Sequence, residues 1–262
     1  MGQTMDRKVI DMKKITKTYR IGDIIVNALR GADLIIREGE FVAIMGPSGS
    51  GKSTLMNIIG ALDIPTTGSY LLEDIDISRL DDNQLAEIRN KKIGFVFQTF
   101  NLLSKSNVMG NIELPLIYSR KNPKKSRRKM VSDVIEAVGL TGWIRHRPNE
   151  LSGGQRQRVA IGRALVNDPA VILADEPTGN LDSRTGEEIL AIFQDLNRQG
   201  KTILFVTHEL ELARHAHKIV YLRDGMIINE EKIDNPVDAR EMLEKMPKLE
   251  DKIYDLEESN SR

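Results

Sequence analysis

A glycine-rich segment in the first quarter of the chain has the residue types and spacing that bind phosphate. It reads Gly46-Pro47-Ser48-Gly49-Ser50-Gly51-Lys52-Ser53 and matches the pattern G-x-x-x-x-G-K-[ST]. The apolar run 41–45 before it predicts a buried strand, and a helical pattern follows. Such a loop directs backbone N–H groups at an anion at a helix N-terminus. We expect these residues to bind a nucleotide: Gly46, Ser48, Gly49, Ser50, Gly51, Lys52, Ser53 and Thr54.

Two side chains of this segment add specific chemistry. Lys52 is placed to reach the β- and γ-phosphates, and the Ser53 hydroxyl is placed to bind the accompanying Mg²⁺. A plain glycine-rich turn between a strand and a helix is the alternative. It is disfavoured because the lysine and hydroxyl positions match as well.

Two adjacent acids end a second apolar run. Residues 171–174 predict a strand, and Asp175 and Glu176 follow it. Asp175 could hold Mg²⁺ through water, and Glu176 could orient and deprotonate a water for attack on the γ-phosphate. Taken alone, this pattern is more often a solvated strand end. Together with the phosphate loop, it predicts hydrolysis.

A second glycine-rich segment, Leu151-Ser152-Gly153-Gly154-Gln155, opens another helical pattern. The free N–H groups of its first turn form a second positively polarised end. Two such ends in one rigid domain cannot both close on one phosphate tail. The segment is also an ordinary helix start, and the functional interpretation adds to that.

With these three segments, the chain from about Lys8 to Glu230 resembles the ATP-binding subunits of ABC transporters. Further matches are Gln98, which resembles the Q-loop glutamine, and Gly179-Asn180-Leu181-Asp182, which resembles the D-loop. His208 resembles the switch histidine, and Tyr19 stands where the family places an aromatic that stacks on adenine. The resemblance implies ATP and Mg²⁺ as cofactors.

The resemblance also implies roles for these residues. Gln98 would link Mg²⁺ and the attacking water to the segment after it, and His208 would contact the γ-phosphate beside the catalytic base Glu176. Asp182 would lie near a subunit boundary. The phosphate loop of one subunit would face the second glycine-rich segment of another copy, head to tail, with two ATP molecules between them. The residues expected at that second face are Ser152, Gly153, Gly154, Gln155 and Asp182.

The match can be narrowed to one branch of the family. Segments 174–182, Gly60-Ala61-Leu62-Asp63 and Leu114-Pro115-Leu116 resemble the cassettes of macrolide-export and lipoprotein-release systems. Glu209 departs from that branch, where Asp commonly follows the histidine. Both are acids, so no catalytic role is affected.

Composition excludes several classes of protein. Lys plus Arg and Asp plus Glu number 38 each, and this balance argues against a protein that grips nucleic-acid backbone. No apolar run approaches the roughly 20 residues that span a bilayer, and the first residues lack a signal-peptide pattern. The sequence has no cysteine. We expect a soluble cytoplasmic chain held at the inner face of the membrane by a partner.

The expected fold is α/β: a P-loop NTPase (RecA-like) core with a mostly parallel sheet, an antiparallel β subdomain within residues 9–73 and an inserted α-helical subdomain at about 100–160. Helices are expected at 156–166 and 186–198, and strands at 171–174 and 202–207. The expected domains are 1–235 for the nucleotide-binding unit and 236–262 for a charged, helical tail. The basic run 120–129 is a solvated surface or a contact with anionic lipid.

The predicted function is ATP hydrolysis that drives a separate integral membrane permease, for export or release of a substrate that the sequence does not identify. The alternative is a regulatory ATPase that controls a cell-envelope membrane protein without moving a solute. A translation or DNA-repair ATPase of this family is disfavoured because those carry two such units or a long coiled-coil insertion.

Overall fold

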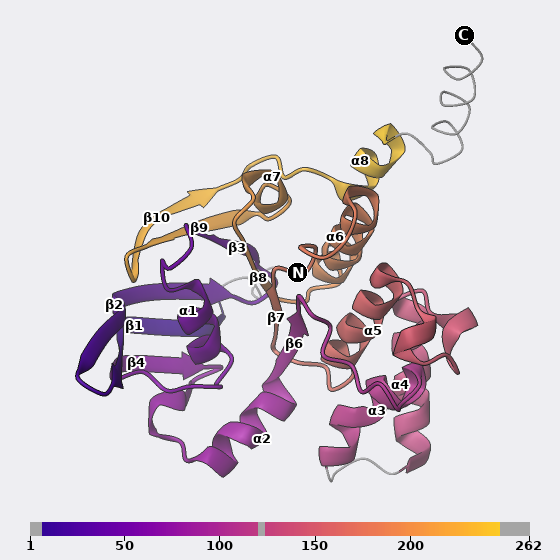
Figure 1. The fold of residues 1–262 in the computed structure, drawn as a ribbon, viewed down its shortest axis with the longest axis horizontal. Helices are drawn as coiled ribbons and strands as arrows, with labels where there is room; N and C mark the ends of the chain where they lie inside the picture. The colour runs from indigo at the N-terminus through magenta and orange to yellow at the C-terminus, as the bar shows by residue number, and fades with distance from the viewer. Residues whose placement is uncertain (1–6, 120–123, 247–262) are drawn as a thin grey trace.

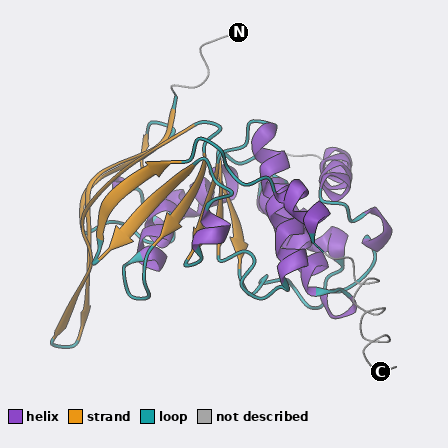
Figure 2. Ribbon diagram, turned by 90° about the horizontal axis from the view of Figure 1, so that it is seen from above, coloured by secondary structure: helices purple, strands orange, loops and turns teal. Residues whose placement is uncertain are grey.

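The computed structural model describes residues 7–119 and 124–246. Two β-sheets occupy one side of the molecule, and a group of helices occupies the other (Figures 1 and 2). Among the described residues, no helix is both long and apolar enough to cross a bilayer.

The larger sheet has six strands in the order β10-β9-β3-β8-β7-β6. Neighbours from β9 to β6 are parallel, and β10 pairs antiparallel with β9. This confirms the mostly parallel sheet. The strands are β3 (Phe41–Met45), β6 (Ile93–Phe97), β7 (Val171–Asp175), β8 (Ile203–Thr207), β9 (Lys218–Arg223) and β10 (Met226–Lys232).

The smaller sheet is the expected antiparallel one, with strand order β2-β1-β4-β5. Its long hairpin, β1 with β2, pairs Ile21 with Ile24 at its tip. The 3-10 helix η1 (Ile77–Arg79) follows β5, and α2 leads back to β6 of the larger sheet. These elements are β1 (Lys8–Ile21), β2 (Ile24–Arg37), β4 (Thr67–Leu72), β5 (Ile75–Asp76) and α2 (Asp82–Lys92).

Alternation along β3 divides the core into two. Phe41, Ala43 and Met45 face one hydrophobic cluster together with the helical side of the molecule. Val42 and Ile44 face a second cluster, which contains residues of the smaller sheet and of α1 (Lys52–Ile59). Successive residues of a strand point to opposite faces, so a fully apolar strand is what a sheet covered on both sides requires. Helix α1 therefore lies between the two sheets.

The helical group contains α3 (Val108–Tyr118), α4 (Lys124–Ala137), the 3-10 turns η2 (Thr141–Trp143) and η3 (Pro148–Glu150), and α5 (Gly153–Leu165). Helix α5 packs on α3 and also on β6. A Cβ on Gly94 of β6 would lie 2.5 Å from the carbonyl oxygen of Ala164, so the absence of a side chain there permits the close approach. The inserted helical subdomain is thus joined to the core through α5.

Helix α6 (Ser183–Arg198) covers the same face of the larger sheet, and α7 (Leu210–Ala213) follows β8. Both α5 and α6 begin three residues earlier than the apolar patterns alone predict. Ser152 accepts a hydrogen bond from the N–H of Gln155, and Asp182 accepts one from that of Thr185. These caps satisfy N–H groups that would otherwise lack partners, and so extend each helix.

Of the expected C-terminal tail helix, the described part is α8 (Ala239–Lys245), which packs on α6 at Leu190 and Ala191. Leu249, Ile253 and Leu256 lie outside the described residues. In the basic run, residues 120–123 also lie outside them, and residues 124–129 form the start of α4.

Removing a large side chain from the helical face should test this core. Phe193 of α6 is fully buried, so Phe193→Ala should lower the free energy of unfolding by about 3–5 kcal/mol, measured by urea denaturation. Ile228→Ala, at an exposed position of β10, should stay within about 0.5 kcal/mol of the parent protein. Equal losses in the two variants would contradict the assigned core.

Candidate functional site

The phosphate-loop sequence joins β3 to α1 and curls as predicted. Gly49 and Gly51 have φ values of 78° and 103°, which L-residues rarely adopt. At Gly46 the requirement is space, because a Cβ there would lie 2.1 Å from the carbonyl oxygen of Leu222 in β9. All three glycines of the loop are thus required by backbone geometry or by close packing. The N-terminus of α1 opens directly into a cleft.

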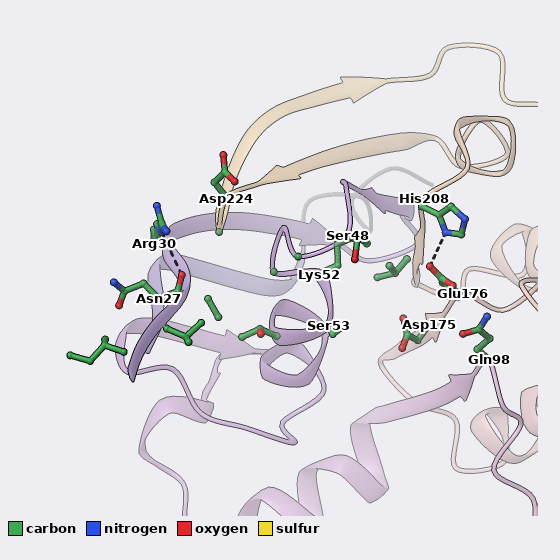
Figure 3. A pocket seen from close by; sticks show the side chains of 18 residues that line it. Asn27, Arg30, Ser48, Lys52, Ser53, Gln98, Asp175, Glu176, His208 and Asp224 are labelled. Carbon is green, nitrogen blue, oxygen red and sulfur yellow. Dashed lines mark hydrogen bonds and ion pairs between the residues drawn. The ribbon is translucent and has the colours of Figure 1, made fainter. Parts of the chain in front are cut away.

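That cleft has a volume of about 1000 Å³ (Figure 3). Most of the residues predicted from the phosphate loop line it: Ser48, Gly49, Gly51, Lys52, Ser53 and Thr54. Gly46 and Ser50 lie behind this surface. Ser50 is buried, and its Oγ is one of the buried polar atoms with no partner among the described residues. The Lys52 ammonium donates to the carbonyls of Gly46 at 2.7 Å and Pro47 at 2.9 Å, so it lies over the loop.

The predicted acids reach the same cleft. Asp175 ends β7, and Glu176 follows in the left-handed region, with a φ of 41°. Oε1 of Glu176 lies 2.9 Å from Nδ1 of His208, which follows β8 (Figure 3). A left-handed φ is unfavourable for a residue with a side chain, by about 1 kcal/mol or more. The turn nonetheless directs the Glu176 carboxylate at His208. The contact with His208 orients Glu176, the candidate base.

Burial raises the pKa of the Asp175 carboxyl above its ordinary value, and the neighbouring Glu176 raises that pKa further, while Lys52 opposes them. Ionising the Asp175 carboxyl at the end of β7 therefore costs free energy in the folded protein. A divalent cation would relieve that cost. The described residues contain no group of three or more His, Cys, Asp or Glu side chains suited to a metal ion. This fits Mg²⁺ that takes most of its ligands from phosphates and water.

Gln98, the third predicted catalytic residue, follows β6 and lines the cleft beside the acids (Figure 3). Its backbone carbonyl accepts a hydrogen bond of 3.0 Å from the Asn180 side chain. A Cβ on Gly179 would lie 2.6 Å from the Gln98 Nε2, so the two predicted loops are in contact. The predicted metal ligands Ser53, Gln98 and Asp175 all line this one cleft.

The backbone after Gln98 is unusual. Phe100 and Asn101 both have positive φ, at 61° and 48°. Arg163 of α5 donates to both of their carbonyls, at 2.9 and 2.5 Å, and the Arg156 guanidinium lies 5.3 Å from the Phe100 ring centroid. The segment that leads into the helical group is thus held by the helix that begins at Gly153.

One wall of the cleft is not predicted by any sequence pattern. Residues of β2 and of the β9–β10 turn line it opposite the acids, and Figure 3 shows Asn27 and Arg30 on that side. The turn supports the phosphate loop, since Gly225 donates to Ser50 O at 2.9 Å and accepts from Arg30 N at 2.8 Å. The residues missed are Ile25, Val26, Asn27, Ala28, Arg30, Val206, Asp224 and Gly225.

The other predicted nucleotide residues form a second group. Ser152, Gly153, Gly154, Gln155 and Asp182 are not among the residues that line the cleft. They lie together instead: a Cβ on Gly154 would be 2.5 Å from Cγ2 of Thr185, whose hydroxyl bonds to Asp182 at 2.6 Å.

The two helix starts at α5 and α6 are therefore neighbours. Ser152 and Gln155 form a capping box, with each side chain bonded to the other residue's N–H. Tyr19 does not line the cleft itself. It lies on β1, paired with Val26 of the cleft wall and within hydrogen-bond reach of Thr54.

Comparison with known proteins gives a consistent result. Residues 29–179 match the family model described as ABC transporter. An uncharacterized ABC transporter ATP-binding protein of Thermotoga maritima is 53% identical over 84% of this chain and 94% of its own length. A macrolide export ATP-binding/permease protein of Chlorobaculum tepidum is 52% identical over 86% of this chain, which spans only 34% of that relative.

The fold has a close match among solved structures. The dimeric post-hydrolysis structure of the ATP-binding cassette MJ0796, bound to ADP and Pi, aligns with a TM-score of 0.79 and 49% identity. The alignment covers 86% of this chain and 99% of that one. The same cassette, from Methanocaldococcus jannaschii, is 50% identical by sequence over 86% of this chain and 97% of its own length. The match confirms the expected α/β fold.

The raised pKa of Asp175 predicts an effect on stability. Since the folded state disfavours the ionised carboxyl, Asp175 contributes a destabilisation that sets in as the pH rises from the ordinary value of 3.8 through the raised one. Asp175→Asn should therefore raise the melting temperature at pH 7 without nucleotide, and the gain should vanish at the acid end of that window. Asp234→Asn, at an exposed acid, should change little. A lower melting temperature for Asp175→Asn at pH 7 would contradict the assignment.

Proposed function

Because this chain belongs to the ABC transporter family of ATP-binding cassettes and is an ATPase, we propose that it hydrolyses ATP only when two copies close on the nucleotide and thereby drives a separate membrane permease. One observation carries the proposal. The phosphate loop, Asp175, Glu176, Gln98 and His208 line one cleft, whereas the glycine-rich segment at the start of α5 lies outside it. Each cleft then lacks one wall, which a second copy would supply.

In this proposal the cleft binds ATP with its phosphates at the N-terminus of α1. The loop N–H groups and Lys52 would bind the phosphate oxygens. Ser53, Asp175 and Gln98 would hold Mg²⁺, which when bound neutralises charge on the phosphates. Glu176 would accept the proton of the attacking water, and its contact with His208 at 2.9 Å would keep that carboxylate in place.

The second copy would approach with the first turn of its α5. The N–H of Gln155 is used by the Ser152 side chain, so the anion-binding role falls on the N–H groups of Gly153 and Gly154. Asp182 adjoins this turn through Thr185 and would report closure at the boundary. A head-to-tail pair of this kind is symmetric and buries two nucleotides. The dimeric cassette MJ0796 is a precedent from a similar protein.

The permease is the second proposed partner. The similar protein of Chlorobaculum tepidum is named an ATP-binding/permease protein, so in that relative one polypeptide carries both functions. We place this chain at the inner face of the membrane through such a partner, in the export or release branch, and assign it no nucleic-acid partner. Residues 1–235 would form the nucleotide-binding unit, and residues 236–262 would form an appended tail.

Replacing the proposed base should separate binding from hydrolysis. Glu176→Gln keeps the shape of the side chain but removes its ability to accept a proton, so kcat should fall about 10²- to 10⁴-fold. ATP affinity should stay within a few-fold, and an ATP-dependent dimer should accumulate on size-exclusion chromatography. Glu209→Gln, at the exposed acid after His208, is the matched control. A Glu176→Gln variant that hydrolyses ATP at the parental rate would refute the role.

Mixing two inactive variants should test the shared site. Lys52→Ala damages the phosphate loop, and Ser152→Arg damages the start of α5. In a mixed dimer one cleft combines the intact phosphate loop of Ser152→Arg with the intact start of α5 of Lys52→Ala. The mixture should therefore regain ATPase activity that neither variant has alone. The check is activity against mixing ratio, with a maximum near equal amounts. Parental activity in Ser152→Arg alone, or a mixture that stays inactive at every ratio, would contradict the shared site.

A further inference from the structure

A cluster of three side chains joins the cleft rim to the end of α1. We call it the Tyr19 cluster; it consists of Lys17, Tyr19 and Asp63. The Tyr19 hydroxyl donates to Oδ2 of Asp63 at 2.9 Å. The Lys17 ammonium donates to Oδ1 of Asp63 at 2.5 Å and to the Ile64 carbonyl at 2.8 Å. It also lies 5.0 Å from the centroid of the Tyr19 ring. Both ends of the tyrosine, the ring and the hydroxyl, are thus held.

The Tyr19 ring is on the side of the hairpin that faces the cleft. Tyr19 on β1 pairs directly with Val26 on β2, and paired residues of an antiparallel ladder project to the same face. Val26 lines the cleft, with Ile25 next to it. Both apolar side chains are largely exposed, at 42% and 57%. This end of the cleft offers an aromatic ring and apolar surface, which suit the flat face of a nucleotide base.

Asp63 is itself held firmly. Its N–H donates to the carbonyl of Asn57 in α1 at 3.2 Å, and its Oδ1 accepts from the N–H of Ile64 at 2.8 Å. The loop continues into a contact with β1, where Thr66 N–H donates to Thr16 O at 2.8 Å. Only 27% of the Asp63 side chain and 12% of that of Lys17 are exposed. A partly buried carboxylate on a fixed loop is a rigid acceptor for the phenol.

The charges favour the same arrangement. Burial raises the pKa of Asp63, but hydrogen bonds from Lys17, Tyr19 and the Ile64 N–H outweigh it and hold that pKa below its ordinary value. Burial, together with Asp63, raises the pKa of the Tyr19 phenol, and a hydrogen bond with Thr54 opposes them. At neutral pH the carboxyl is therefore an acceptor, and the phenol keeps the proton that it donates.

We propose that Asp63 and Lys17 are positioning residues for the nucleotide base, which hold the Tyr19 ring at a fixed place relative to the phosphate loop. The link runs through α1. This helix begins at Lys52 in the phosphate loop and ends shortly before Asp63, and its eight residues span about 12 Å. The base and phosphate ends of the site are thereby fixed to one rigid element. The inference rests on the proposed function, which makes the cleft an ATP site with Tyr19 beside the base.

The test compares a ligand that has a base with one that has none. Binding of MgATP and of magnesium tripolyphosphate is measured by calorimetry for the full chain and for Asp63→Ala. Freeing the Tyr19 ring should weaken MgATP binding and raise KM about three- to tenfold, with kcat within about twofold. Tripolyphosphate affinity should be unchanged. Asp63→Asn, which keeps an oxygen acceptor for the phenol, should recover most of the MgATP affinity.

A double-mutant cycle adds a second readout. Tyr19→Phe keeps the ring but removes the donor, so Asp63→Ala should cost little more in that background. Asp234→Ala removes an exposed carboxylate that also contacts a lysine, and it is the matched control. Thermal melting of each variant reports whether the fold is intact.

Three results would overturn the inference: unchanged MgATP affinity in Asp63→Ala, an equal loss of tripolyphosphate affinity, or full additivity in the cycle. Tyr19→Ala separates this inference from the function on which it rests. If Tyr19→Ala weakens MgATP binding and Asp63→Ala does not, only the positioning role fails. If neither variant changes MgATP binding, the placement of the base beside Tyr19 fails as well.

Discussion

The parallel register of four adjacent strands is the constraint on which the candidate site depends. The ladders pair Phe97 with Asp175, Asp175 with Val206, and Met45 with Thr207, so β6, β7, β8 and β3 end at one level of the sheet. Loops that leave parallel strands at their carboxyl ends emerge at one edge, where such sheets bind ligands. The residues that directly follow these four strands are Gln98, Glu176, His208 and Gly46. Segments far apart in the sequence are thus brought to one cleft by strand order alone.

This constraint explains which parts of the site the sequence could predict. The phosphate loop is recognisable from its own glycine, lysine and hydroxyl pattern, and the paired acids from the apolar run before them; both patterns are local. His208 is identified by family resemblance. The wall formed by β2 and Gly225 is not local: it arises because a turn between β9 and β10 contacts the phosphate loop through Ser50. No periodicity within either segment signals that contact. The apolar patterns predict the starts of α5 and α6 three residues too late, because capping depends on a single side chain ahead of the apolar pattern.

The predicted residues separate into two groups because different elements of one core hold them. The cleft group holds excess negative charge near Asp175, whereas the start of α5 presents the positive end of a helix dipole. Within one chain Asp175 is fixed at the end of β7 and the other feature at the start of α5, so the two remain apart. Family resemblance identifies the residues of the second group, but helix propensity and apolar periodicity do not predict their position relative to the cleft. That required the packing of α5 against α6, which the contact between Gly154 and Thr185 defines.

Phe100 and Asn101, both with left-handed backbone, connect the cleft residue Gln98 to helix α5, whose start carries the second group. Each non-glycine residue in that conformation costs about 1 kcal/mol or more, and two hydrogen bonds from Arg163 offset that cost. Arg163 belongs to α5, so part of the hydrogen bonding that holds the backbone after Gln98 comes from the helical group. A rotation of the helical group that withdrew the guanidinium would let the pair relax. The conformational energy of this segment is therefore coupled to the position of α5 relative to the core.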